Sequence, residues 1–173
     1  MRLHSHFALV AAGALALAAL AVPQAGVAAE PGSREAIDQA AAVNTELALA
    51  YMREGNLKAA REKIDKALQQ DARTANTQMA AGFVYDKLGD KKKALSHFEQ
   101  AVKLGGKDNP DVVANAAVYF CMNGEPKRGE QYMLQAAASP LNARPDVAYT
   151  NAGRCARGDG RPKDAEQSFR KAL

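Results

Sequence analysis

The chain has 173 residues, of which 24% are charged and 47% hydrophobic, and its formal net charge is +4 at pH 7. Only 6% of the residues are aromatic, and there are two cysteines and no tryptophan. This length suits one domain, and a positive charge so weak and so dispersed argues against a nucleic-acid-binding protein.

The first segment, residues 1–29, is predicted to be a secretory signal peptide. Arg2 supplies a positive start, residues 7–22 are small and apolar, and residues 27–29 fit a small-x-small cleavage site before Glu30. An apolar run of about 16 residues is short for a membrane span. No cysteine lies near the cleavage site, so no lipobox is present. We therefore expect an exported protein in an oxidising compartment, with a mature net charge of about +3 once Arg2 is removed.

After this segment, most of the chain repeats one pattern. Gly55, Gly89, Gly124 and Gly160 recur at intervals of about 35 residues. If each glycine is counted as position fifteen of a unit, three columns hold only small residues: Ala48, Gly82, Ala117 and Gly153 at position eight, Ala60, Ala94, Gly129 and Ala165 at twenty, and Ala67, Ala101, Ala136 and Ala172 at twenty-seven. Two further columns are mostly large and apolar: Tyr51, Tyr85, Phe120 and Ala156 at position eleven, and Ile64, Phe98, Met133 and Phe169 at twenty-four.

These columns predict an antiparallel helical hairpin in each unit. Helices approach closely where side chains are small, and larger residues fill the space between such points. Each glycine is expected to end a first helix in a left-handed conformation, and Pro126 and Pro162 to begin second helices. The predicted fold is an all-α, right-handed solenoid of about four hairpins, with an ordinary alanine-rich helix bundle as the alternative.

The predicted boundaries follow from the repeat. Residues 30–40 form an N-terminal extension, and the units cover residues 41–74, 75–108, 109–145 (with an irregular joint) and 146–173. The last unit stops within its second helix and has no polar capping helix, which solenoids normally carry. We therefore expect the natural chain to be longer.

Several positions of the first helices are expected to line the inner groove of this solenoid. These predicted groove residues are Leu49, Met52, Met79, Phe83, Asn115, Val118, Met122, Asn151 and Arg154. The methionines and Phe83 would offer an adaptable apolar surface, while the amides of Asn115 and Asn151 would bond to the backbone of an extended peptide. Arg154, and Arg157 on the same predicted helix, would bind a carboxylate or an acidic segment. The alternative for each is a contact with a neighbouring repeat, or a solvated side chain.

Cys121 and Cys155 lie on the first helices of neighbouring units, which should run side by side. An even number of cysteines in an exported protein favours a disulfide, and two buried free thiols are the alternative. A metal site is not expected, because no further ligands stand at a suitable spacing.

Catalytic signals are lacking in the sequence. His97 is the sole histidine after residue 29 and is expected on the surface of a second helix. No Ser/His/acid set and no glycine-rich phosphate loop appears. An open groove also lacks the enclosed pocket that small ligands need. We therefore expect no enzyme activity, no cofactor and no small-molecule ligand.

The repeat length and its columns of small residues resemble the tetratricopeptide repeat (TPR). A narrower resemblance covers residues 44–173. The segments 47–56 and 60–68 resemble the first repeat of the type IV pilus biogenesis and stability proteins, the PilF/PilW group, and the segments 115–120, 151–155 and the joint 139–145 are also similar to that group.

This resemblance implies a role in pilus assembly and twitching motility. The expected protein is a periplasmic adaptor, associated with the outer membrane, that helps the pilus secretin localise and assemble into its multimer. Members of the group are commonly lipoproteins, so the missing lipobox points to an indirect association with the membrane, through a partner. A general periplasmic TPR scaffold for envelope assembly is the alternative function.

Overall fold

The computed structural model describes residues 30, 32–106 and 108–173, so the predicted signal peptide lies outside the described residues. Within these residues all regular structure is helical, and eight helices follow one another. Their bounds are α1 (Arg34–Arg53), α2 (Leu57–Gln70), α3 (Ala75–Lys87), α4 (Lys91–Gly105), α5 (Pro110–Met122), α6 (Pro126–Ala137), α7 (Pro145–Gly158) and α8 (Pro162–Ala172).

The helix ends follow from local chemistry. The Oγ of Ser33 accepts a hydrogen bond from the backbone N–H of Ala36 at 3.1 Å, which caps α1. Each of the last four helices begins at a proline, whose missing N–H is not needed there. The four repeated glycines all have positive φ, from 72° at Gly160 to 92° at Gly124. The predicted helix ends at these glycines, and the predicted starts at Pro126 and Pro162, are confirmed.

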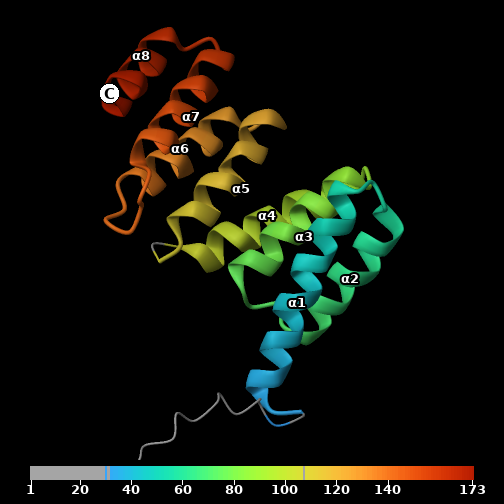
Figure 1. The fold of residues 1–173 in the computed structure, drawn as a ribbon. Coiled ribbons are helices and arrows are strands. Elements are labelled where there is room, and N and C mark those ends of the chain that lie inside the picture. The colour runs from blue at the N-terminus through green and yellow to red at the C-terminus, as the bar shows by residue number, and fades with distance from the viewer. Residues whose placement is uncertain (1–29, 31, 107) are drawn as a thin grey trace, which may run out of the picture.

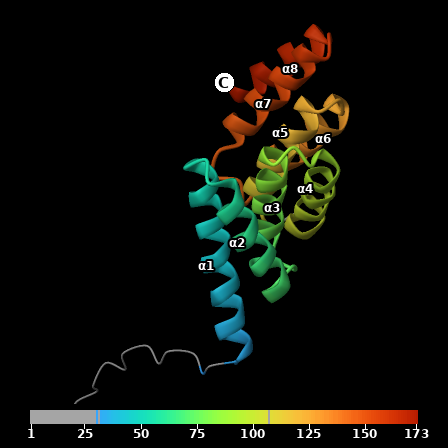
Figure 2. The same cartoon turned by 90° about the vertical axis from the view of Figure 1, so that its right-hand side faces the viewer.

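The helices pair as α1–α2, α3–α4, α5–α6 and α7–α8, and these hairpins stack in chain order (Figure 1). The pair α1–α2 lies at one end of the stack and α7–α8 at the other, while the first turns of α1 project beyond its neighbours (Figure 2). The prediction of an all-helical solenoid of hairpins is confirmed.

Within each hairpin, position eight of the first helix faces position twenty-four of the second. A Cβ placed on Gly153 would lie 2.6 Å from the Phe169 ring. The residues at the two positions match in size across the units: Ala48 with Ile64, Gly82 with Phe98, Ala117 with Met133, and Gly153 with Phe169. An aromatic ring therefore occurs where the opposite residue is glycine, and a flexible or aliphatic chain where it is alanine.

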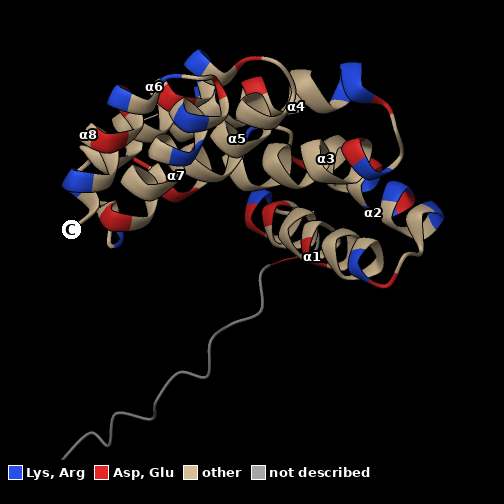
Figure 3. Cartoon of the chain, turned by 90° about the horizontal axis from the view of Figure 1, so that it is seen from above, with Lys and Arg blue, Asp and Glu red and all other residues tan. Residues whose placement is uncertain are grey.

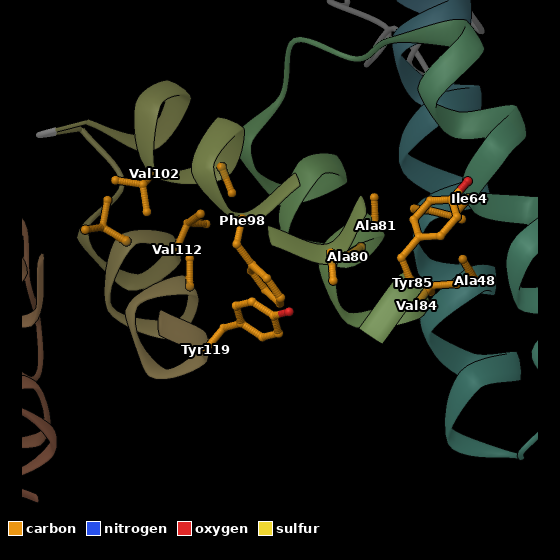
Figure 4. Close-up of a cluster of buried hydrophobic side chains, with 14 of the residues drawn as sticks. Ala48, Ile64, Ala80, Ala81, Val84, Tyr85, Phe98, Val102, Val112 and Tyr119 are labelled. Carbon is orange, nitrogen blue, oxygen red and sulfur yellow. The ribbon is translucent and has the colours of Figure 1, made fainter. Parts of the chain in front are cut away.

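A continuous hydrophobic core runs from α1 to α6. Figure 4 shows Phe98 of α4 facing Tyr119 of α5, and their ring centroids are 4.3 Å apart in a stacked arrangement. Ile64 and Phe98 are completely buried. Residues of α5, α6 and α7, among them Met133 and Ala152, form a second, smaller cluster. The stacked aromatic pair thus joins the second unit to the third.

Buried polar side chains fix the position of α1. Thr45 and Thr77 lie 3.1 Å apart through their hydroxyl oxygens, which joins α1 to α3. Asn44 donates to Oε1 of Gln70 at 2.8 Å, which joins α1 to α2. Buried polar groups are stable when they are paired in this way.

His97 lies between helices and not on the surface, so that expectation was wrong. The side chain is half-buried, and its ring stacks on Tyr85 with centroids 5.3 Å apart. Gln78 donates to the carbonyl of Ala72 at 2.6 Å, which turns its Oε1 towards Nδ1 of His97 at 2.7 Å. The Nδ1–H of the neutral ring is therefore the donor in this contact.

Charged residues are interspersed along the helices (Figure 3), and two arginines link second helices. Arg128 of α6 donates to Glu99 of α4 at 2.9 Å. Arg161, next to the start of α8, forms an ion pair with the largely buried Glu130 of α6. Neighbouring units are therefore held together by ionic as well as apolar contacts.

Candidate functional site

A hollow of about 490 Å³ opens between α5, α6 and α7, and we call it the disulfide hollow. Four predicted groove residues line it, together with both cysteines and parts of the neighbouring turns: Val118, Met122, Asn151, Arg154, Cys121, Cys155, Gly124, Pro126, Met133, Gly158 and Asp159. The volume falls within the range of sites that hold a small ligand or a few side chains.

Helical spacing explains why these side chains meet. Val118 and Met122 are one turn apart on α5, and Asn151 and Arg154 are one turn apart on α7. The two helices are the first helices of neighbouring units, so their repeated positions face the same side of the stack. The hollow is therefore a product of the repeat.

Cys121 and Cys155 form a disulfide at the base of this hollow, with their Cα atoms 5.7 Å apart. The bond joins α5 to α7 across the seam between the third and fourth units. Cys155 is only 3% exposed. The covalent link therefore fixes the separation of the two helices whose side chains line the hollow.

The lining is mainly apolar and carries one charge that lacks an ionic partner. Met133 is buried at the base, and Met122 at the rim is 79% exposed. Asp159 accepts a hydrogen bond from Nε of Arg161 at 2.7 Å. Arg154 is exposed and makes no ion pair with any residue in the described part of the chain. An apolar group with a carboxylate close to it would complement this surface.

The other predicted groove residues lie elsewhere. Four of them are half-buried and pack against the large core: Leu49, Met52, Met79 and Phe83. Phe83 meets the Phe98 ring edge-on, with centroids 5.0 Å apart. Asn115 is exposed on α5 and does not line the hollow. The structure thus gathers four of the nine predicted residues around one hollow.

Met133 and Gly158 belong to the hollow but were not among the predicted groove residues. Met133 occupies the core column at position twenty-four, so its sequence signal indicated packing inside a hairpin. Gly158 sits at the end of α7, where a Cβ would meet no atom within 4 Å. A count of helical turns from Asn151 and Arg154 would have placed Gly158 on the same face.

Outside the disulfide hollow, the described residues contain neither a metal-binding cluster nor a membrane-spanning helix. No group of three or more His, Cys, Asp or Glu side chains could hold a metal ion within them. None of the helices in this part of the chain is both long and apolar enough to span a bilayer. Tyr85 has its pKa raised to about 12 by burial and by its hydrogen bond to Asp65. That tyrosine supports packing between α2 and α3 and lies outside the hollow.

Comparison with known proteins identifies the repeat. Residues 39–105 match the tetratricopeptide repeat family. A curated Haemophilus influenzae protein of uncharacterised function is 32% identical over 101 residues, which cover 58% of this chain and 56% of that protein. The chain therefore spans little more than half the length of this relative.

Two solved structures extend the likeness to most of the chain. The type IV pilus biogenesis factor PilW is 26% identical, with a TM-score of 0.68, over 78% of this chain and 61% of that one. Pseudomonas aeruginosa PilF has the same fold at 23% identity, with a TM-score of 0.70, over 79% of this chain and 61% of that one. The chain thus contains tetratricopeptide repeats and has a fold similar to those of PilW and PilF, and it spans about three fifths of the length of each.

Proposed function

We propose that this tetratricopeptide-repeat protein is a non-catalytic periplasmic adaptor of type IV pilus biogenesis. In this role it helps the outer-membrane secretin to localise and to assemble into its multimer, and it reaches the membrane through that partner. The observation that carries the proposal is the likeness to PilW, at 26% identity over 78% of the chain. Tetratricopeptide folds typically serve as interaction surfaces, which agrees with an adaptor.

The disulfide hollow supplies the docking surface in this proposal. It combines the exposed Met122 and the half-buried Val118 with an amide and an unpaired guanidinium. Surfaces of this kind bind segments of other proteins, because apolar contacts give affinity and polar groups fix the direction of the chain. A disulfide across the hollow also suits an oxidising compartment.

The deciding experiment removes the gene from the source bacterium and examines its outer membrane. We expect heat-resistant secretin multimers and surface pili to be lost together, and to return with the full-length protein. Secretin monomers should remain, because the adaptor acts on assembly. Normal multimers and normal pili in the deletion strain would remove the support for a role with the secretin, and a general envelope scaffold would then be the better proposal.

A second experiment tests the amides predicted to hold peptide backbone. Replacing Asn115 and Asn151 together by alanine should weaken binding of the secretin and leave the melting temperature nearly unchanged. The matched control is Asn76→Ala, which removes an exposed asparagine of α3 outside the disulfide hollow. Equal secretin binding by the double variant and the control would show that neither amide holds the backbone of the secretin.

A further inference from the structure

We propose that the disulfide hollow binds an extended, acidic and apolar protein segment. One apolar side chain of that segment enters over the disulfide, and a carboxylate two residues further along the segment pairs with Arg154. This inference rests on the proposed adaptor function and names the chemistry of the segment that the adaptor would bind. The spacing of two residues follows from an extended strand, in which alternate side chains point to the same side.

The apolar half of the argument comes from the base and rim of the hollow. The disulfide and the buried Met133 form a floor without charge, and the half-buried Val118 forms one wall. Met122 stands at the rim with 79% of its surface exposed, although it is a large apolar residue. An unbranched methionine can close over an inserted side chain, because its thioether arm adapts to irregular shapes. Burying leucine-sized groups here would remove apolar surface of both partners from water.

The charged half depends on how the arginines around the hollow are paired. Arg161 pairs with Asp159, Asp164 and Glu130, so the carboxylate of Asp159 in the lining already has a cationic partner. Arg154 has no carboxylate partner among the described residues. Arg154 is therefore the charged side chain of the lining that remains without an ionic partner. A guanidinium binds a carboxylate in a planar, two-pronged geometry, which makes an acidic side chain its best complement.

Asn151 gives the segment a direction. It lies one turn before Arg154 on α7 and is half-buried, and its side-chain amide makes no hydrogen bond with another described residue. Its amide can donate to a carbonyl and accept from an N–H of the same extended backbone. A segment bonded to Asn151 therefore runs along α7 and brings its next side chains towards Arg154.

The test uses the purified protein and short peptides that are acetylated at the N-terminus and amidated at the C-terminus, with binding measured by fluorescence anisotropy at low salt. The first peptide places leucine and aspartate on one face of a strand, in the order Leu-Ser-Asp-Ser-Leu-Ser-Asp. The second replaces aspartate by asparagine, and the third replaces leucine by alanine. The protein variants are Arg154→Ala and Arg157→Ala. Arg157 is the matched control, because it is an exposed arginine on the same helix whose guanidinium lies 6.0 Å from the Phe169 ring, outside the disulfide hollow.

We expect the first peptide to bind the unmodified protein most tightly. Arg154→Ala should weaken its binding about fivefold, as an exposed ion pair predicts, while Arg157→Ala changes it less than twofold. The asparagine peptide should bind both arginine variants with equal affinity, because it has no carboxylate to lose. The inference is overturned if the first peptide does not bind, or if it binds the Arg154→Ala protein as tightly as the unmodified one.

Failure of this inference can be told apart from failure of the proposed function. If secretin multimers depend on the gene but peptide binding does not depend on Arg154, only the proposed chemistry of the bound segment is overturned. If the peptides bind selectively but secretin multimers do not depend on the gene, the proposed chemistry of the segment is supported, and the segment belongs to another acidic protein. Circular dichroism and melting curves of both arginine variants establish that each is folded.

Discussion

Gly82 and Phe98 face each other across the hairpin of α3 and α4 so closely that a Cβ on Gly82 would lie 2.8 Å from the Phe98 ring. Three ring carbons stand within 2.9 Å of that point, and Phe98 is completely buried. The ring therefore cannot move aside into solvent. Close packing of this kind makes an added methyl group costly.

Gly82→Ala should accordingly lower the free energy of unfolding by about 1–3 kcal/mol, although alanine favours helix more than glycine does. Adding Phe98→Ile should recover part of that loss, because alanine opposite isoleucine is the arrangement of Ala48 and Ile64 in the first unit. Denaturant unfolding of the single and double variants measures both effects. Gly158→Ala is the control, since its Cβ would meet no atom within 4 Å and should not destabilise. A Gly82→Ala protein as stable as the unmodified one would contradict this packing.

The disulfide should contribute strongly to the stability of the last two units. Cys121 and Cys155 are 34 residues apart, and a loop of that length corresponds to about 3–4 kcal/mol of chain entropy. Guanidinium unfolding in the presence of a dithiol should therefore begin at a lower concentration than without it. The double variant Cys121→Ala/Cys155→Ala should unfold at the same concentration under both conditions. Identical curves for the unmodified protein with and without dithiol would argue against a structural role.

His97 should make stability depend on pH. Burial, and then the positive charge of Lys93, lowers the pKa of His97, while Asp65 and Asp90 act in the opposite direction. The folded protein therefore favours the neutral ring, and the unfolded chain takes up its proton at a higher pH, near the usual value of about 6.5. This contribution to stability is present above that value and is lost as the pH falls through the lower pKa of the folded state.

Melting temperatures measured between about pH 7 and pH 5 test this assignment. The unmodified protein should lose stability on acidification, and His97→Gln should lose less, since it cannot be protonated. An NMR titration of the His97 ring gives the direction of its pKa independently. A folded-state pKa above that of a model histidine peptide would reverse the assignment.

Arg161 should contribute far more to the stability of the fold than most surface arginines do. It joins Glu130 of α6 to the start of α8, and Glu130 is only 8% exposed. Arg161→Ala would leave that carboxylate largely buried without its cation, so we expect a loss of about 2–4 kcal/mol in unfolding free energy. Arg170→Ala, which breaks the exposed pair with Glu166, should cost less than about 1 kcal/mol. Chemical denaturation of both variants makes the comparison, and equal losses would show that the burial of Glu130 has no effect.

The hairpins were predictable because each column repeats one packing requirement four times. A single glycine in a helical pattern is ambiguous, but Gly55 and Gly124 agree in position and both have positive φ. The polar contacts were harder to foresee. Gln78 orients His97 through a side chain that is itself held by the carbonyl of Ala72. Neither contact occurs at a position that the repeat predicts. Such contacts depend on loop geometry, which the periodicity of the sequence does not describe.

The groove was predictable only in part, for a related reason. Position within a repeat indicates which face of a helix a residue occupies, but the amount of exposed surface depends on the neighbouring unit. Phe83 therefore packs against Phe98, while Val118, at the same repeat position in the third unit, lines the disulfide hollow. The joint before α7, residues 138–144, is also longer than the other connections between the helices.

Where repeats differ at two facing positions, one order of substitution costs less stability than the other. Consider the change from glycine opposite phenylalanine, as at Gly82 and Phe98, to alanine opposite isoleucine. Phenylalanine should be replaced first, because its ring leaves no room for the methyl group of alanine. The opposite order gives an overpacked intermediate with alanine opposite phenylalanine. Replacing phenylalanine first gives an intermediate with glycine opposite isoleucine, which contains only a small cavity. The less costly route from glycine and phenylalanine to alanine and isoleucine therefore changes the second helix first, and the reverse route changes the first helix first.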